Sequence, residues 1–403
     1  MGNGNSKPYP YYDVAVIGAG PVGSQVAFRL AGEGHRVVVL EQKASLNKAV
    51  CCTGIISQEC ASTFAIDDAI ILRRVNSARV FSPSGKSIRL CRPETQVCIV
   101  DRTALNTAMA SRAQNKGADY IFNSRVHGIS VGKDSVTLEI EPGRCQADRF
   151  EARMLVIANG FSPEPVEGVD KPRDFVMGIQ VEVATTAIDE VEVYMGREVA
   201  PGFFAWLVPT SPGKALLGLM SRRQSGLYLK NLMASLASQG KIISTDVKPG
   251  YRAIPLKPSS RTFSDRVIVV GSAAGQVKPT TGGGIYYGLI CANIAADNLS
   301  PSLGADNLSA RHLVSYDRIW RKKLGKELNL GYWARKVYEQ LSDTQIDWLF
   351  DIVKSEGIAE ALLKSDDFSF DWHTGMVTRL IGHRALFEAM KVMKPPFLSG
   401  SKV

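Results

Sequence analysis

A glycine-rich segment near the start of the chain has the residue spacing of a phosphate-binding turn. Gly18, Gly20 and Gly23 follow the apolar run 14–17, and Glu41 comes 18 residues after Gly23. The first glycine permits a tight turn, the second lets a pyrophosphate approach the backbone, and the third lets the next helix pack on the strand. The N-terminus of that helix attracts phosphates, and Glu41 can accept hydrogen bonds from ribose hydroxyls. The spacing predicts a dinucleotide site, and the alternative is a tight turn without ligand.

A second glycine-rich segment, residues 271–284, follows another short strand-like run and leads into a helical pattern from Ile285. A strand that enters such a turn before a helix presents backbone N–H groups and a helix N-terminus to a polar ligand group. Two turns of this kind suit a long ligand that lies across the fold.

Other kinds of site have less support. The five histidines are scattered and the seven cysteines form no CxxC spacing, so we expect no metal or iron–sulfur site. The net charge of +9 suits an anionic cofactor, a lipid surface or nucleic acid. Because no nucleic-acid-binding motif or long basic tail is present, we expect no nucleic-acid partner. The basic run 319–326 either contacts anionic headgroups or a substrate phosphate, or is a solvated helix face packed on one side.

The elements that must position these residues indicate a mixed α/β protein. Residues 14–40 form a strand–turn–helix–strand unit. Alternating apolar residues in 71–100 and 126–157 predict hairpins, and residues 226–239 predict a helix. Helical patterns fill the chain from residue 310, with breaks near residues 342, 357 and 375.

Length and composition limit the class of protein. A chain of 403 residues predicts two or three domains of about 150 residues. The content of 45% hydrophobic and 22% charged residues is typical of globular proteins. The polar N-terminus has no signal-peptide pattern and the cysteine count is odd, so we expect reduced thiols and a cytoplasmic location. No uninterrupted apolar stretch reaches the length of a membrane span, which takes roughly 18 residues or more.

Three segments resemble those of the glutathione-reductase-type flavoproteins. Residues 271–285 resemble their second FAD-contacting segment, Asp-Arg-Thr-Ala-Leu at 101–105 resembles their arginine-bearing segment, and Leu-Val-Ile-Ala-Asn-Gly at 155–160 resembles their strand ending in Ala-Asp-Gly. A narrower resemblance follows. Cys-Cys-Thr-Gly-Ile-Ile-Ser at 51–57 is similar to the cysteine–glycine segment of the geranylgeranyl reductase family, and Pro-Gly-Phe-Phe-Ala-Trp-Leu-Val-Pro at 201–209 is similar to its PxxYxWxFP signature. The match runs from Asp13 to about residue 397.

The resemblance implies an α/β fold with a Rossmann-like FAD-binding domain, an inserted antiparallel-sheet substrate domain of α+β type and a C-terminal helical region. We expect the discontinuous FAD domain in residues 10–70, 101–165 and 260–300. The substrate domain is expected in 71–100 and 166–259, and the helical region in 301–403.

The family implies FAD-dependent saturation of carbon–carbon double bonds in polyprenyl chains, whether of lipids, chlorophyll-type or quinone-type compounds. An isoprenoid substrate and peripheral contact with a membrane surface are therefore expected. No second GxGxxG marks a nicotinamide site, so NAD(P)H and reduced ferredoxin both stay open as electron donors. Together, the glycine motif and the resemblance predict the cofactor contacts Gly18, Gly20, Val22, Gly23, Glu41, Cys51, Cys52, Gly54, Arg102, Val126, Ser272, Gly284 and Ile285.

The aromatic signature at 201–209 predicts which residues contact the substrate. Phe204 and Trp206 are predicted to line an apolar tunnel, together with Phe203 and Leu207, for which packing in a core strand is the alternative. Cys51 or Cys52 is a candidate for proton transfer, although small buried thiols are usually inert.

Some residues depart from the family pattern. Ser272 and Asn159 stand where Asp is usual, Phe204 replaces Tyr and Val208 replaces Phe. A serine hydroxyl can hydrogen-bond, but it lacks the charge-assisted bond of a carboxylate, which is roughly twice as strong.

Two other flavoprotein activities remain as alternatives. An FAD-dependent monooxygenase or halogenase shares both FAD segments, and residues 204–209 are also similar to the halogenase WxWxIP signature. An electron-transfer flavoprotein is the third reading. Its relatives carry iron–sulfur cysteines towards the C-terminus, whereas the last cysteine here is Cys291.

Overall fold

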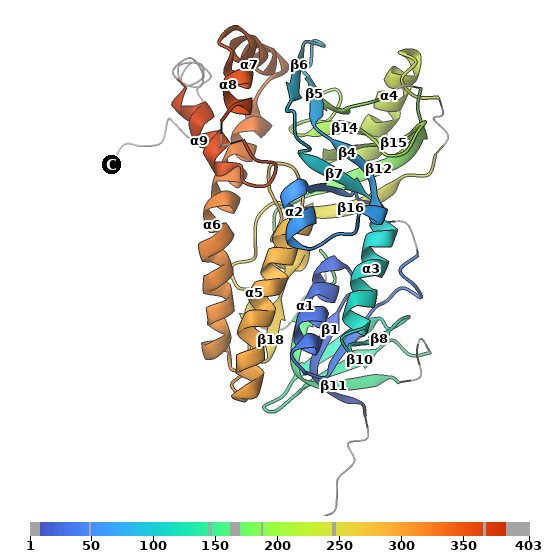
Figure 1. Ribbon diagram of the computed structural model, residues 1–403, viewed down its shortest axis with the longest axis vertical. Helices are drawn as coiled ribbons and strands as arrows, with labels where there is room; N and C mark the ends of the chain where they lie inside the picture. Colours follow the sequence, from blue (N-terminus) through green and yellow to red (C-terminus); the bar gives the residue numbers. More distant parts are fainter. Residues whose placement is uncertain are drawn as a thin grey trace, which may run out of the picture.

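The computed structural model describes residues 9–47, 50–143, 145, 147–161, 170–186, 188–243, 247–365 and 368–383. Residues 384–403 of the predicted C-terminal helical region therefore lie outside the described part of the chain. A mostly parallel sheet lies at one end of the long axis and a seven-stranded sheet at the other, and helix α6 (Ala310–Gln340) runs beside both (Figure 1). This is the predicted mixed α/β architecture.

The first sheet carries the glycine-rich turns. Its central strand β1 is parallel to both neighbours, β11 and β2, and its residues Val14, Ala15 and Val16 are fully buried because both faces of the sheet are covered. Helices α1 (Pro21–Gly32), α3 (Arg102–Gln114) and α5 (Ile285–Gly304) cover one face, and the β9–β10–β11 meander covers the other. The main strand order is β17 (Phe263–Ser264), β18 (Val267–Val269), β11 (Arg149–Ile157), β1 (Tyr11–Ile17), β2 (Val37–Leu40) and β8 (Asp119–Ile121), with β10 (Val136–Ile140) and β9 (Val126–Val131) joined to β11.

The second sheet has seven strands. Helix α4 (Ser225–Ser238) packs on one of its faces through Leu229, Leu232 and Leu236. All neighbouring strands are antiparallel except β13 and β5. The order is β16 (Gly250–Pro255), β12 (Phe175–Ala184), β15 (Lys214–Ser221), β14 (Phe204–Pro209), β13 (Val191–Met195), β5 (Ser77–Phe81) and β6 (Ser87–Cys91).

The structure also contains a small three-stranded sheet, whose strands alternate along the chain with strands of the two larger sheets. It consists of β3 (Ile55–Ser57), β7 (Val97–Val100) and β4 (Ile71–Val75), and is accompanied by α2 (Gln58–Thr63) and the short helix η1 (Asp68–Ile70). Residues 71–100 are thus divided between two sheets, because β5 and β6 belong to the seven-stranded sheet.

The C-terminal helices begin and end where the sequence predicts breaks. Ser342 caps α7 (Asp343–Ser355) in a capping box with Gln345, and Gly357, with φ +61°, precedes α8 (Ile358–Leu363). Helix α9 (Thr374–Gly382) begins at the third predicted break, one residue before residue 375. Within the described residues, no helix combines the length and apolar character needed to cross a bilayer.

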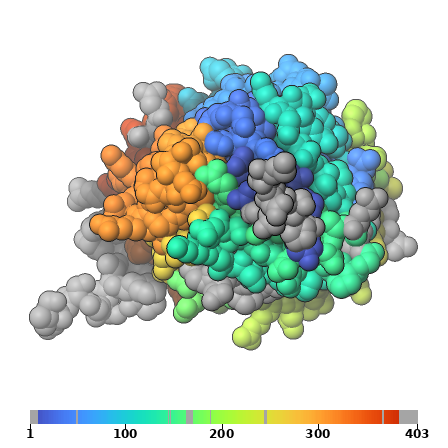
Figure 2. Space-filling view, turned by 90° about the horizontal axis from the view of Figure 1, so that it is seen from below, coloured from blue at the N-terminus to red at the C-terminus, as the bar shows by residue number. Residues whose placement is uncertain are grey.

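Helices α5 and α6 belong to the same core as the first sheet. Seen from the parallel-sheet end, their orange atoms lie beside the blue atoms of the N-terminal residues (Figure 2). Trp320 and Leu324 of α6 are buried in this core, whereas Lys322 and Lys323 are exposed. The basic run is therefore packed on one side, and its exposed lysines leave contact with anionic headgroups as a prediction.

Candidate active site

Two adjoining cavities lie between the sheets. The first, of about 320 Å³, borders the glycine-rich turn after β1. The second, of about 650 Å³, lies against the seven-stranded sheet and the start of α5. Both cavities are bordered by Pro21, Val22, Arg102, Arg252 and Ser272, so a ligand in one cavity can contact a ligand in the other.

The three glycines of the first turn have different physical roles. Gly18 has φ +103°, and a Cβ there would lie 2.7 Å from the carbonyl oxygen of Ala158. A Cβ on Gly23 would lie 2.0 Å from the carbonyl oxygen of Gly18. A Cβ on Gly20, in contrast, would meet nothing within 4 Å, and Gly20 borders the first cavity. Packing therefore requires Gly18 and Gly23, whereas Gly20 leaves open space that suits a close-lying ligand.

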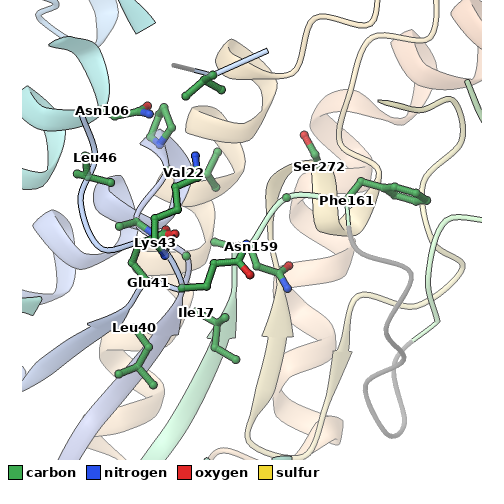
Figure 3. A pocket seen from close by; sticks show the side chains of 18 of the residues that line it. Ile17, Val22, Leu40, Glu41, Lys43, Leu46, Asn106, Asn159, Phe161 and Ser272 are labelled. Atoms are coloured by element: carbon green, nitrogen blue, oxygen red, sulfur yellow. Dashed lines mark hydrogen bonds between the residues drawn. The ribbon is translucent and has the colours of Figure 1, made fainter. Parts of the chain in front are cut away.

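Glu41 is held at the carboxyl end of β2 by two backbone groups. Its Oε2 accepts a hydrogen bond from the N–H of Ala19 at 3.0 Å, and its Oε1 accepts one from the N–H of Lys43 at 3.0 Å. Each carboxylate oxygen keeps a further acceptor position for a ligand hydroxyl. Glu41 borders the first cavity together with Val22, Asn159 and Ser272, which come from other parts of the fold (Figure 3).

Arg102 supplies a positive charge at the boundary of the two cavities. Asp101 caps α3 by accepting hydrogen bonds from Thr103 and Ala104 at 2.8 and 3.0 Å, which places Arg102 in the first turn. The Nε and Nη1 atoms of Arg102 are buried without a hydrogen-bond partner in the described part of the protein, as is Oδ1 of Asn106. Buried polar groups are normally paired, so these atoms fit contacts with a polar, anionic ligand such as FAD.

Ser272 lies in the second glycine-rich turn, within the short helix η2 (Gly271–Ala274). The N–H of Gly271 donates to Oε1 of Gln276 at 2.7 Å, which closes the turn. A Cβ on Gly284, at the N-terminus of α5, would lie 3.2 Å from Oγ of Ser272. The hydroxyl and the helix N-terminus therefore lie side by side at the second cavity, where Ile285 also borders the space.

Strand β14 provides an aromatic wall of the second cavity. Phe204, Trp206 and Val208 border the cavity, whereas Phe203 and Leu207 are buried in the core under α4. The expectation that Phe203 and Leu207 line the tunnel is therefore wrong, since alternate residues of a strand point to opposite faces. The Nε1 atom of Trp206 is buried without a hydrogen-bond partner among the described residues.

Both cysteines of the 51–57 segment border the second cavity. Burial and the neighbouring Cys52 raise the pKa of the Cys51 thiol, against the charge of Arg252. Burial would also raise the pKa of Cys52, but the charges of Arg102 and Arg252 and hydrogen bonds from Gly54 and Arg102 lower it overall. The pair thus combines a thiol that keeps its proton with one that ionises more readily.

The remaining predicted residues divide between the cavities and the scaffold. Val126 borders the first cavity, whereas Gly23 and Gly54 border neither. Gly54 has φ +69°, and a Cβ there would lie 2.3 Å from the carbonyl oxygen of Val100, so its role in the described structure is close packing.

Sequence reasoning missed several residues that border the cavities. Arg252 borders both, and Arg335, Phe370 and Met376 border the second. None of them belongs to a motif that the sequence analysis identified, so no local pattern marked them. Burial lowers the pKa of Arg335 to about 10.

Comparisons with known proteins agree with this architecture. The model of the family described as "Lycopene cyclase protein" matches residues 13–338. Digeranylgeranylglycerophospholipid reductase 2 of Methanothermobacter thermautotrophicus is 30% identical, over 86% of this chain and 93% of that protein. Digeranylgeranylglycerophospholipid reductase of Methanocaldococcus jannaschii is 26% identical, over 87% of this chain and 91% of that protein.

Solved structures share the fold. A geranylgeranyl bacteriochlorophyll reductase-like protein of Thermoplasma acidophilum has a TM-score of 0.80 at 20% identity, covering 96% of this chain and 99% of that one. Halogenase PltM in complex with phloroglucinol and FAD has a TM-score of 0.66 at 12% identity, covering 95% and 93%. Since a relative that is 30% identical covers most of its length, the chain belongs to the geranylgeranyl reductase family of FAD-dependent oxidoreductases.

Proposed function

We propose that this protein is an FAD-dependent reductase that saturates carbon–carbon double bonds of a polyprenyl chain carried by a lipid. The observation that carries the proposal is the pair of adjoining cavities, one at the dinucleotide-binding turn and one, twice as large, walled by apolar side chains. The relatives named digeranylgeranylglycerophospholipid reductase support a lipid-borne geranylgeranyl chain as the substrate.

The first cavity would hold most of the cofactor. Gly20 leaves room for its phosphates, Glu41 offers acceptors to a ribose, and Arg102 offers unpaired N–H donors. Val126 and Ser272 border the same space, and the start of α5 borders the second cavity. When bound, FAD supplies the hydride for the reduction.

The second cavity would hold the prenyl chain. Phe204, Trp206 and Val208 form a wall that orients the chain and excludes water. Saturation of an alkene also needs a proton from a side chain at this cavity, and the Cys51 thiol, whose pKa is raised by burial, is one candidate donor. Exposed Lys322 and Lys323 on α6 would let the protein contact the anionic membrane surface that contains the substrate. NAD(P)H and reduced ferredoxin are the two candidate electron donors.

The test is a single turnover of the purified, FAD-loaded protein. The flavin is reduced anaerobically with dithionite, a geranylgeranyl-bearing lipid is added, and the flavin spectrum and product mass are followed. Reoxidation with a gain of two hydrogens per reduced double bond is expected. A flavin that stays reduced until oxygen enters, with no hydrogenated product, would instead support the monooxygenase or halogenase alternative.

A further inference from the structure

The segment 368–376, which we call the C-terminal strap, forms part of the second cavity through Phe370 and Met376. A buried ion pair ties it to the loop 278–284 at the start of α5. Nζ of Lys278 donates to Oδ1 of Asp371 at 2.7 Å and to the carbonyl oxygen of Phe370 at 3.0 Å. The side chains of Lys278 and Asp371 are only 4% and 2% exposed, so the strap is held firmly against this loop.

Thr280 and His373 meet across this contact. Thr280 borders the cavity, and its Oγ1 lies 2.7 Å from Nδ1 of His373. His373 is 8% exposed, and its Nε2 lies 2.9 Å from the carbonyl oxygen of Phe370. Because a carbonyl oxygen only accepts hydrogen bonds, Nε2 carries a hydrogen in either protonation state of the ring.

The protonation state of His373 therefore decides where the hydroxyl hydrogen of Thr280 points. In neutral His373, Nδ1 has no hydrogen, so the hydroxyl of Thr280 donates to it. In the imidazolium, Nδ1–H donates to Oγ1, which leaves the hydroxyl hydrogen of Thr280 free to face the cavity.

We propose that Thr280 and His373 form a relay that delivers a proton to an alkene in the second cavity, an inference that rests on the proposed function. Thr280 is the catalytic residue, and His373 is a positioning residue that acts through it. Oγ1 of Thr280 releases its proton to one alkene carbon while the other carbon receives the hydride, and Oγ1 recovers a proton from Nδ1 of His373. The alkene gains two electrons with the hydride, and the imidazolium becomes neutral.

The charges around His373 set the direction of the pH dependence. Burial and the charge of Lys278 lower the pKa of His373, whereas the hydrogen bond to Phe370 and the charges of Glu327 and Asp371 raise it; the overall pKa is lowered. The active imidazolium is therefore lost as the pH rises through this lowered pKa. Transfer of the hydride to the alkene should slow as the pH rises above it.

The test combines NMR of the full-length, FAD-loaded protein with single-turnover reduction of a geranylgeranyl-bearing lipid. Four variants are compared with the wild type: His373→Gln, Thr280→Val, Thr280→Ser and, as the control, His312→Gln, which removes an exposed histidine of α6. In the wild type, the His373 resonance, assigned by its loss in His373→Gln, should titrate below the ordinary histidine pKa. Thr280→Val should shift this titration and Thr280→Ser should not.

In the kinetic measurement, His373→Gln and Thr280→Val should lower the single-turnover rate about 100-fold or more, the usual contribution of a positioned acid. In both variants the rate should no longer decrease as the pH rises, whereas in Thr280→Ser and His312→Gln it still should. The relay would be overturned if both Thr280→Val and His373→Gln kept the pH profile of the wild type and a single-turnover rate within about twofold of it. The proposed function would still stand. No hydrogenated product from the wild type would overturn the proposed function itself, and the relay with it.

Discussion

Alanine at Gly20 and at Gly23 should separate ligand binding from folding, although the two glycines belong to one turn. Gly20 has extended backbone angles, φ −71° and ψ 176°, which alanine adopts without strain. A Cβ there meets no protein atom within 4 Å, and an alanine N-cap costs about 1 kcal/mol relative to glycine. The unfolding free energy of FAD-free Gly20→Ala should therefore stay within about 1 kcal/mol of the wild type.

The new methyl group of Gly20→Ala would instead occupy space in the first cavity. Overpacking of about 1–3 kcal/mol against a bound phosphate weakens FAD binding roughly 5-fold to 150-fold. Gly23→Ala behaves differently, because its Cβ would lie 2.0 Å from a backbone oxygen that cannot rotate away. An overlap penalty of about 3 kcal/mol, less about 1 kcal/mol of helix propensity, leaves a loss of about 2 kcal/mol in stability.

Two measurements check this pair of variants. Urea unfolding of the FAD-free proteins gives stability, and quenching of flavin fluorescence gives the FAD dissociation constant. If Gly20→Ala bound FAD as tightly as the wild type, the open side of the turn would not be a cofactor site. If it lost as much stability as Gly23→Ala, the space around Gly20 would not be open.

Three further outcomes are expected. Asp371→Asn should lower the unfolding free energy by about 3–5 kcal/mol, because it leaves the buried charge of Lys278 without its partner; urea unfolding measures this, and a loss below about 1 kcal/mol would contradict it. Ser272→Asp should tighten FAD binding about fivefold, since a charge-assisted hydrogen bond contributes about 1 kcal/mol more than a neutral one; an unchanged or weaker FAD affinity would show that the carboxylate finds no partner there. Iodoacetamide at neutral pH should modify Cys52 before Cys51 in the FAD-free protein, because the pKa of Cys52 is lowered and that of Cys51 is raised. Peptide mass spectrometry follows the order of modification, and earlier modification of Cys51 would contradict the prediction.

The sequence predicts best the structural features that depend on residues close together in the chain. The turn at Gly18, the strand before it, the acid at Glu41 and the helix breaks at Ser342 and Gly357 all depend on local backbone geometry, and the structure contains each of them. The pattern around Phe204 identified the correct strand, but not which of its residues face the cavity, because that depends on which face of the sheet α4 covers.

The sequence by itself therefore determined the two glycine-rich turns, the order of the elements and the family to which the chain belongs. Only the tertiary structure brought Arg252 to the junction of the two cavities and placed the C-terminal strap beside the start of α5. Thr280 and His373 are 93 residues apart, yet their side chains lie 2.7 Å apart. Such a contact has no local pattern, because it depends on how the long helix α6 and the strap pack over the core, and distant packing leaves no regular spacing in the sequence.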